Sequence, residues 1–333
     1  MPHTLPRDRL LALLAAAADR RVAVVGDAML DVYLRGDVER ISPEAPVPVV
    51  RVRERRHALG GAANVAQNVA ALGARPALVA TAGEDAPGRL LREMLAAMGA
   101  DPGTLVDVGR PTTTKTRLLA RGQQVVRFDE EEDVDLAGDD VARLVAAAER
   151  AIAGADALVL EDYNKGVLVP PVIERAIARA RERGVPIVVD PKYRHFFAYR
   201  GATVVKPNRR ELESALGAAV DLDDPAALPS TLERLGADQL LLTLGERGMV
   251  VIGPGGVVDR IPTTAREVYD VVGAGDTVTA YLAVMLAAGA TMREAAVIAN
   301  FAAGVEVGKL GAATVSGEEV VEAYDHYCES VAR

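Results

Sequence analysis

The segment Val268 to Gly289 combines the residue types that an anion site and a proton acceptor would need. Gly273 and Gly275 flank Ala274 and allow close backbone approaches that a side chain would block. If a helix begins near Ala274, its first amides lack internal partners and form an anion site, most naturally for phosphate. Asp276 follows at once, and a carboxylate there suits deprotonation of a hydroxyl beside that phosphate. A strand–turn–helix joint with Asp276 as the N-cap is the structural alternative.

Further polar residues follow several apolar, strand-like runs. Ligands in parallel sheets bind beyond the carboxyl ends of the strands, so residues at separate strand ends are expected to share one rim. The polar groups in such positions are Asp27 and Asp31, residues 161–165, residues 190–192, residues 206–208 with Glu211, and residues 243–245. Their convergence indicates function more strongly than any one motif does.

The elements that would carry these residues alternate between strand and helix. Such alternation predicts an α/β fold whose parallel sheet is covered by helices on both faces. The expected strands are 22–25, 76–80, 157–160, 187–189, 203–206, 239–243, 249–252 and 257–261. The expected helices are 10–18, 60–73, 88–98, 139–153, 171–183, 208–216, 225–235, 274–288, 292–307 and 317–328.

Two segments do not fit this alternation. Residues 32–55 alternate in pieces and contain Pro43, Pro46 and Pro48, which restricts them to edge strands and turns. Residues 112–129 read as two strands joined at Gly122-Gln123. Together they predict a small exposed β-sheet lid on a single domain, residues 1–333.

Composition excludes some classes of function. The 333 residues carry a formal net charge of −9 and no Lys/Arg-rich run, which argues against nucleic-acid binding. No apolar run approaches membrane-spanning length, and one cysteine suits a reducing cytoplasm. Only 4% of the residues are aromatic, so the core must consist mainly of Ala, Val and Leu.

Two motifs carry a resemblance to the ribokinase-like (PfkB) carbohydrate kinases over nearly the whole chain. The segment from Gly60-Gly61 through Asn64 to Gly73 resembles the N-terminal signature of that family. The segment from Asp270 to Asp276 resembles its C-terminal signature, with Val272 where many members carry Thr. The resemblance implies a ribokinase-like, doubly wound and mostly parallel sheet with a lid. It also implies an ATP-dependent sugar kinase.

The resemblance assigns roles to individual residues. Amides of Gly273, Ala274, Gly275 and Asp276 would hold the transferring phosphoryl group, and Asp276 would be the base. The acceptor would contact Asp31, Gly60, Gly61 and Asn64, with Arg121, Glu161, Asp162, Lys165 and Lys192 as further candidates, and Arg194 as a fourth candidate cation for a substrate phosphate. The nucleotide would contact Asn208, Glu211, Thr243, Gly245, Gly248, Asn300 and Gly304.

The cofactors follow from the same resemblance. Asn208 and Glu211 match a motif that acts near Mg²⁺, often through water, although Asn208 as a helix cap with Glu211 in a capping box is the structural alternative. Residues 243–248 could equally form a plain hairpin turn, and Asn300 could be a solvated residue. Carbonyls near Asp270 and residues 309–313 could hold a monovalent cation, as in some relatives.

Within the family, residues 40–49 resemble the flap of the heptose-phosphate kinases of lipopolysaccharide synthesis. Residues 161–166 and 190–192 carry the same resemblance. It implies phosphorylation of D-glycero-β-D-manno-heptose 7-phosphate at its anomeric hydroxyl. It also implies a homodimer made through the lid, and a separate nucleotidyltransferase as pathway neighbour because this sequence contains no His-x-Gly-His element.

Other functions remain open from the sequence. A kinase for another phosphosugar, such as fructose 1-phosphate, or for a nucleoside is one alternative, and few aromatic residues argue mildly against the nucleoside. A nucleotide-binding regulator without catalysis is another, although binding alone gains nothing from Asp276. A Rossmann oxidoreductase is disfavoured because Gly26-Asp27 lacks the Gly-x-Gly-x-x-Gly pattern after the first strand.

Overall fold

The computed structural model describes residues 5–100, 104–121, 123–223, 228–254, 258–265 and 268–332. Three sequence-based expectations fall partly outside these ranges: Gly122 of the lid turn, residues 225–227 of one helix and residue 257 of one strand.

Within those ranges, nine strands form the main sheet, in the order β13-β12-β11-β10-β9-β8-β1-β4-β5. Neighbours from β11 to β5 are parallel, whereas β12 and β13 are antiparallel, which confirms the expected mostly parallel sheet. The strands are β1 Arg21–Gly26, β4 Arg75–Ala82, β5 Leu105–Asp107, β8 Ala157–Glu161, β9 Ile187–Asp190, β10 Val204–Val205, β11 Gln239–Thr243, β12 Met249–Ile252 and β13 Val258–Ile261. The sequence analysis missed β5, which is only three residues long.

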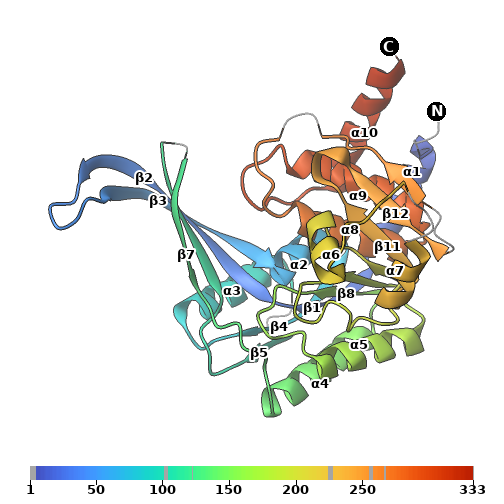
Figure 1. Cartoon of the computed structure of the whole chain (residues 1–333), viewed down its shortest axis with the longest axis horizontal. Helices are drawn as coiled ribbons and strands as arrows, with labels where there is room; N and C mark the ends of the chain where they lie inside the picture. The colour runs from blue at the N-terminus through green and yellow to red at the C-terminus, as the bar shows by residue number, and fades with distance from the viewer. Residues whose placement is uncertain are drawn as a thin grey trace.

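Helices cover both faces of this sheet (Figure 1). One face packs against α1 Arg7–Ala17, α2 Ala62–Ala71, α3 Ala86–Ala97, α8 Ala274–Ala287, α9 Met292–Glu306 and α10 Gly317–Ala332. The other packs against α4 Asp139–Ala153, α5 Pro170–Arg183, α6 Arg209–Leu216 and α7 Leu228–Leu235. Alternate residues of a strand serve opposite faces, so Val24 of β1 joins the first core and Val25 the second.

The lid is a separate four-stranded sheet in the order β3-β2-β6-β7. Its strands are β2 Ala28–Ile41, β3 Pro48–Gly61, β6 Thr114–Ala120 and β7 Gln123–Glu130. β2 starts directly after β1, and its first half is buried while its second half projects from the body beside β3 (Figure 1). The three prolines lie in or beside the turn between β2 and β3, where the missing N–H groups interrupt no central ladder. This confirms the expected lid.

The outer part of the lid exposes apolar side chains. They are Ile41, Val47, Val52, Val125, Val126 and Phe128, each more than 40% exposed. A patch of this kind on strand edges is a site where another chain can pair or pack.

Two further features concern the rest of the surface. α1 and α10 lie side by side, where Arg7 forms a bidentate ion pair with Asp325 at 2.7 and 2.8 Å (Figure 1). Among the helices that the structure describes, none has the length and apolar character needed to cross a bilayer.

Candidate active site

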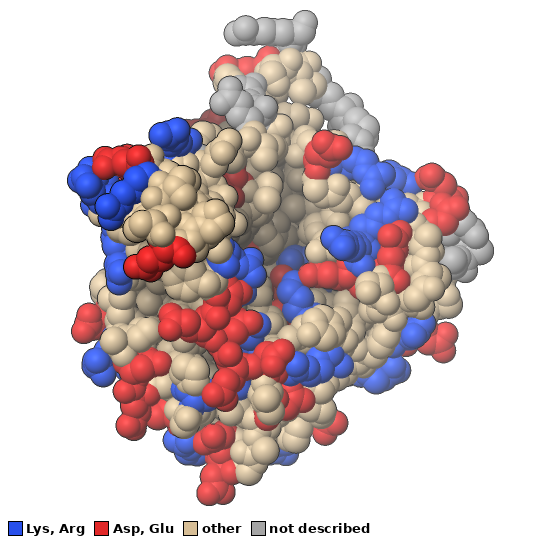
Figure 2. Space-filling model, turned by 60° about the vertical axis from the view of Figure 1, so that its left-hand side comes forward, with Lys and Arg blue, Asp and Glu red and all other residues tan. Residues whose placement is uncertain are grey.

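Charged residues from four neighbouring strands meet at one edge of the main sheet. Asp27 follows β1, and the parallel register pairs Gly26 with Glu161 and Glu161 with Asp190. Lys206 follows β10 next to them. The convergence expected from the strand ends is therefore present in the fold. Figure 2 shows a hollow between the lid and the body, with basic and acidic side chains on its rims.

Asp276 occupies the first turn of α8. Gly273 caps this helix with φ of 96°, a left-handed conformation that favours glycine. The Asp276 carboxylate is only 4% exposed and accepts two hydrogen bonds: Asn64 donates Nδ2–H to Oδ2 at 2.8 Å, and the Tyr163 hydroxyl donates to Oδ1 at 2.6 Å. The two donors come from α2 and the loop after β8, so three distant segments fix one carboxylate.

The pKa of Asp276 is closer to neutral pH than the pKa of an exposed aspartate. Burial raises the pKa of Asp276 to about 6, while the hydrogen bonds from Tyr163 and Asn64 hold that pKa down. A carboxylate with such a pKa is ionised at pH 7, yet it is a stronger base than an exposed aspartate. General-base catalysis works best when the pKa of the base lies near the operating pH.

The first turn of α8 is open on the side that faces Lys206. A Cβ atom added to Gly275 would lie 3.6 Å from Lys206 Nζ, so the glycine leaves the backbone amide close to that ammonium group. Lys206 is 3% exposed and donates to Asp190 Oδ2 at 2.8 Å. Free amides at a helix start together with a lysine form an anion site.

Three buried carboxylates surround this lysine. Glu161, Asp190 and Asp276 each place one carboxylate oxygen within 4.8 Å of the others. Among the described residues, neither oxygen of Glu161 has a hydrogen-bond partner, and burial raises the pKa of Glu161 well above its usual value. Burial followed by the charge of Asp190 accounts for that shift.

The segment around Asn208 is a helix start. Asn208 Oδ1 accepts from the Glu211 amide at 2.9 Å, and Glu211 Oε2 accepts from the Asn208 amide at 2.9 Å. The structural alternative, a capping box, is thus present, and it leaves the carboxylate partly exposed to the site. Lys192 donates to Glu211 Oε1 at 2.5 Å and lies 4.0 Å from Asp190. Lys192 therefore faces the Asn208–Glu211 segment.

The lid base contributes a second acidic group. Asp31 on β2 is 4% exposed and forms an ion pair with Arg117 of β6. A Cβ atom at Gly60 would lie 2.6 Å from Asp31 Oδ2, and one at Gly61 would lie 2.3 Å from the Asp27 carbonyl oxygen. Both glycines are required by close packing. The sequence analysis did not name Arg117 as a site residue. The alternating pattern predicts the strand that carries it, but it does not show that Arg117 pairs with Asp31.

Not all predicted substrate contacts lie in this group. Arg121 is exposed at the end of β6 and donates to the Val38 carbonyl at 3.1 Å, so it stands apart from Asp276. Both oxygens of Asp162 bind within the protein, one to the Asn164 amide at 2.7 Å and one to the Tyr199 hydroxyl at 2.8 Å. Arg194 pairs with Asp135 at 2.8 Å.

Lys165 and Lys115 lie at the lid base, and Lys115, like Lys192, is also near the Tyr163 ring. Lys165 pairs with Glu131 at 2.6 Å. Lys115 lies 5.5 Å from the centre of the Tyr163 ring, and burial lowers the pKa of Lys115, with a further contribution from nearby Lys165. Lys165, Lys192 and Lys206 each form an ion pair with a carboxylate. Lys115 forms no ion pair within the described part of the chain.

The remaining predicted residues lie around the loop after β11 and on α9. Thr243 ends β11, and Gly245 and Gly248 have φ of 61° and 83° at the two ends of a short 3-10 turn. Asn300 donates to the Pro262 carbonyl at 2.9 Å, so it is not a solvated residue. Gly304 contributes to a cavity of about 320 Å³, which is large enough for part of a nucleotide.

Comparison with known proteins decides the family. The sequence profile of the pfkB family of carbohydrate kinases matches residues 19–319. The chain belongs to the pfkB family of carbohydrate kinases.

Relatives of this pfkB chain include two proteins named bifunctional protein HldE. The one from Paramagnetospirillum magneticum is 46% identical over 305 residues, which is 91% of the chain and 62% of that protein. The one from Gluconacetobacter diazotrophicus is 48% identical over 306 residues, or 90% and 63% of the two lengths. The chain thus spans a little under two thirds of the relatives' length. Since they are named bifunctional, they do not support the expectation of a separate nucleotidyltransferase partner.

Solved structures confirm the ribokinase-like fold. Phosphofructokinase-2 from Escherichia coli superposes with a TM-score of 0.76 at 19% identity, covering 93% of this chain and 99% of that one. Ribokinase from Arabidopsis thaliana, in complex with ribose and ATP, gives 0.71 at 22% identity over 92% and 99%.

Proposed function

We propose that this chain transfers the γ-phosphoryl group of ATP to the anomeric hydroxyl of D-glycero-β-D-manno-heptose 7-phosphate, giving the 1,7-bisphosphate. The observation that carries the reaction type is the buried Asp276 carboxylate at the amide-rich start of α8, beside Lys206. The substrate is supported by the flap at residues 40–49 and by 46 to 48% identity to HldE proteins. Residues 1–333 would form a single kinase domain, of which the lid is a part.

Asp276 would accept the proton of the acceptor hydroxyl. Its carboxylate is held by Asn64 and Tyr163, so its free lone pairs point in a fixed direction. The amides of residues 273–276 and the ammonium of Lys206 would stabilise the charge on the transferring group. Phosphoryl transfer depends mainly on such positioning and charge stabilisation.

Asp31 and Asn64, with the close backbone at Gly60 and Gly61, would bind the sugar hydroxyls. Carboxylate and amide groups suit neighbouring hydroxyls, which both donate and accept hydrogen bonds. Arg117 forms an ion pair with Asp31 and thereby fixes the position of its carboxylate. Closure of the lid over this end would exclude water and so limit hydrolysis of ATP.

Lys115 and Lys165 are the cations that we assign to the far phosphate of the substrate. Lys115 lies near the Tyr163 ring, and Lys165 lies near Lys115. Lys192 is also near that ring but pairs with Glu211, and Arg194 pairs with Asp135. A phosphate monoester carries about two negative charges at neutral pH, and it would replace Glu131 as the partner of Lys165. Charge-assisted bonds of this kind are stronger than neutral ones.

The nucleotide would lie along the loop after β11, with Thr243, Gly245 and Gly248 near its phosphates and Asn300 and Gly304 near its base. Mg²⁺ would neutralise phosphate oxygens when bound. Both oxygens of Glu211 already accept hydrogen bonds, so contact through water fits Asn208 and Glu211 better than direct ligation. A monovalent cation would bind between Asp270 and residues 309–313. These two segments are in contact, because the Gly311 amide donates to Asp270 Oδ2 at 3.1 Å.

We also propose that the chain forms a homodimer through its lid and works in the cytoplasm. The exposed apolar side chains of the outer lid would be covered by the lid of a second copy, which also removes the exposed strand edges. A reducing compartment agrees with the one cysteine of the sequence.

The test is a coupled assay of ADP release with a panel of acceptors. Heptose 7-phosphate should be the best acceptor, and heptose without phosphate should react far more slowly. Lys115→Ala and Lys165→Ala should each raise the KM for the phosphosugar at least tenfold with little change for ATP. Arg175→Ala removes an exposed cation on α5 and serves as the control. Equal activity on heptose with and without its phosphate would refute the substrate, and best activity on fructose 1-phosphate would replace it.

A further inference from the structure

We propose that Tyr163 is a positioning residue for Asp276, and that Asp27 holds the loop which presents Tyr163. The inference rests on the proposed function, because it takes Asp276 to be the base. It concerns two residues that the sequence analysis placed at the strand ends but to which it assigned no role. Both lie at the carboxyl ends of adjacent strands, with Asp27 after β1 and Tyr163 just after β8.

The first part of the argument is the contact with the base. The Tyr163 hydroxyl donates to Asp276 Oδ1 at 2.6 Å, opposite the donation from Asn64 to Oδ2. Each oxygen of the carboxylate is thereby fixed by one donor, so its plane cannot rotate freely. Burial raises the pKa of the Tyr163 hydroxyl well above its usual value, and Tyr163 therefore remains a donor at any working pH.

The Tyr163 ring is itself held in place. A Cβ atom at Gly61 would lie 3.4 Å from its Cδ2, so the glycine permits backbone of β3 to pack against the ring. The ammonium groups of Lys115 and Lys192 lie 5.5 and 5.2 Å from the ring centre, within the range of cation–π attraction. A ring with these neighbours has few alternative rotamers.

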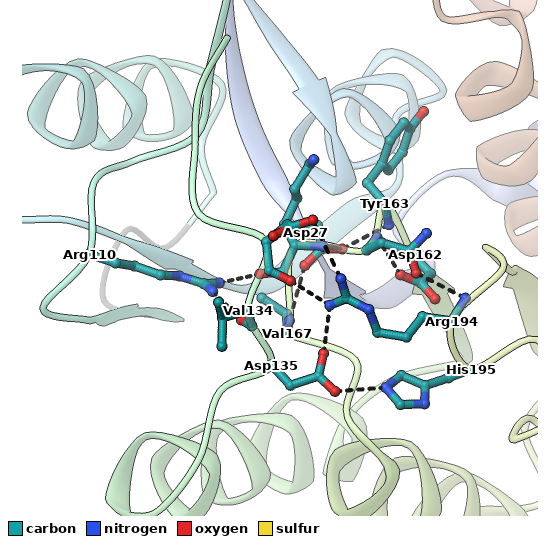
Figure 3. Close-up of polar contacts among 12 residues, drawn as sticks. Asp27, Arg110, Val134, Asp135, Asp162, Tyr163, Val167, Arg194 and His195 are labelled. Atoms are coloured by element: carbon teal, nitrogen blue, oxygen red, sulfur yellow. Dashed lines mark hydrogen bonds and ion pairs between the residues drawn. The ribbon is translucent and has the colours of Figure 1, made fainter.

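The second part of the argument is the loop that carries this ring. Asp27 is 1% exposed, and its carboxylate accepts three backbone amides: Oδ2 binds Tyr163 N at 2.8 Å and Lys165 N at 2.9 Å, and Oδ1 binds Val167 N at 3.1 Å (Figure 3). The donors are alternate residues of one chain segment. They converge because Asn164 and Gly166 between them have φ of 53° and 81°.

This arrangement is costly unless it is complete. A buried ion without partners is strongly disfavoured, and the three amides offset that cost for Asp27. Without the carboxylate, the same three amides would lie buried without acceptors. Asp27, which directly follows β1, therefore fixes the conformation of the loop. The same loop carries Tyr163, whose hydroxyl reaches Asp276.

Further contacts hold the outer side of the same loop (Figure 3). Arg110 donates to the carbonyls of Lys165 and Val134, the latter at 2.9 Å. The Arg194 amide donates to Asn164 Oδ1 at 3.2 Å, and its guanidinium pairs with Asp135. These contacts are exposed or only partly buried, whereas the Asp27 carboxylate is fully buried, so Asp27 fixes the inner side of the loop that leads to Asp276.

The proposal has a consequence for pH dependence. The groups near Asp276 are Asn64, Tyr163, Glu161, Asp190, Lys206 and Glu306. Of these, Tyr163 gives the largest contribution that lowers the pKa of Asp276. Removing its hydroxyl therefore raises the pKa of the base, and the acid limb of the kcat profile moves to higher pH. A tyrosine that acted only through the fold, without contact to Asp276, would not move that limb.

The decisive variant is Tyr163→Phe, measured with whichever phosphosugar the wild-type enzyme phosphorylates best. We expect kcat at neutral pH to fall about 10- to 100-fold, with the KM for ATP within about twofold of wild type. The matched control is Tyr199→Phe, which removes another buried tyrosine hydroxyl bonded to an aspartate of the same segment, Asp162. The control should keep both kcat and the acid limb.

Asp27→Asn tests the second step. The amide keeps the shape but offers one acceptor oxygen, so the loop should shift and kcat should fall. In the Tyr163→Phe background the same change should cost much less, because the contact that it positions is already gone. Fully additive losses in the double variant would overturn the role of Asp27, and melting curves identify a variant that fails to fold.

A readout without any acceptor separates this inference from the proposed function. The carboxyl ¹³C shift of Asp276 can be titrated in wild type and in Tyr163→Phe. An unchanged midpoint, or an unchanged kcat profile, would overturn the inference even if heptose 7-phosphate proves to be the substrate. If no wild-type activity on that sugar is found but the midpoint rises in Tyr163→Phe, the proposed substrate fails and the positioning role stands.

Discussion

Replacing Asp276 by Asn separates the catalytic role of this carboxylate from its effect on stability. The substitution keeps the shape and removes the proton acceptor. Loss of a general base typically lowers the rate by about 10² to 10⁴, so kcat should fall by that factor while ATP still binds. A variant whose kcat lies within about threefold of wild type would refute the assignment of the base.

The same variant should be more stable than wild type at pH 8. The pKa of Asp276 is raised to about 6 in the folded chain from 3.8, so the ionised carboxylate destabilises the fold by roughly 3 kcal/mol once the pH exceeds 6. This penalty is absent below about pH 4, where the group is protonated in both states, and it grows as pH rises through the folded pKa. Asn carries no such penalty.

The net gain is smaller than that figure. Asn offers one acceptor to the two donors Asn64 and Tyr163, which costs about 1 to 2 kcal/mol. We therefore expect a gain on the order of 1 to 2 kcal/mol at pH 8, or roughly 1.5 to 3 °C in melting temperature for a chain of this length. Near pH 5 the gain should shrink or reverse. Thermal melts of both proteins across this range are the assay, and a pH-independent difference would refute the reasoning about burial.

Three further outcomes test other parts of the structure. Gly273→Ala should lower kcat on the order of 100-fold and reduce stability by about 1 to 3 kcal/mol, which kinetics and thermal melts measure. The reason is that the φ of Gly273 is 96° and that the new Cβ would lie 3.1 Å from Asn64 Nδ2. Phe128→Asp should convert a lid dimer to monomers in sedimentation at micromolar concentration, whereas a wild type that sediments as monomer would contradict the dimer. Arg121→Ala should change neither KM by more than about twofold, because its guanidinium contacts only lid backbone among the described residues.

The sequence predicted the architecture well because hydrophobic periodicity is a local signal. Strands such as 157–160 and helices such as 274–288 follow from runs of residues whose burial depends on one neighbouring layer. The start of α2 was placed too early, at residue 60, because Gly60 and Gly61 end β3 and the helix begins at Ala62. The glycines looked like part of the helix, although their close approach to Asp31 and Asp27 explains them.

The site was less predictable because its contacts join segments far apart in the chain. Asp276 meets Asn64 across 212 residues and Tyr163 across 113. Spacing reveals that a polar residue follows a strand, but not where its side chain turns. Lys192, a candidate cation for the substrate phosphate, contacts both Glu211 and the Tyr163 ring, which its spacing did not reveal. Nothing in the sequence marks Lys115, because it lies in an ordinary alternating strand.

The length of β2 gives the lid a mechanical property. β2 runs without interruption from its first residue, packed in the body, to an exposed tip 14 residues later, which is about 45 Å of strand at about 3.3 Å per residue. Its ladder with β3 is irregular near Gly36 and again between Val38 and Arg40. Such a strand is a lever: a rotation of about 5° at its base would carry the tip through about 4 Å. Sub-ångström adjustments at Asp31, where the sugar would bind, would thus be amplified at the far end, and a fluorophore at the tip would report on occupancy of a site that it never touches.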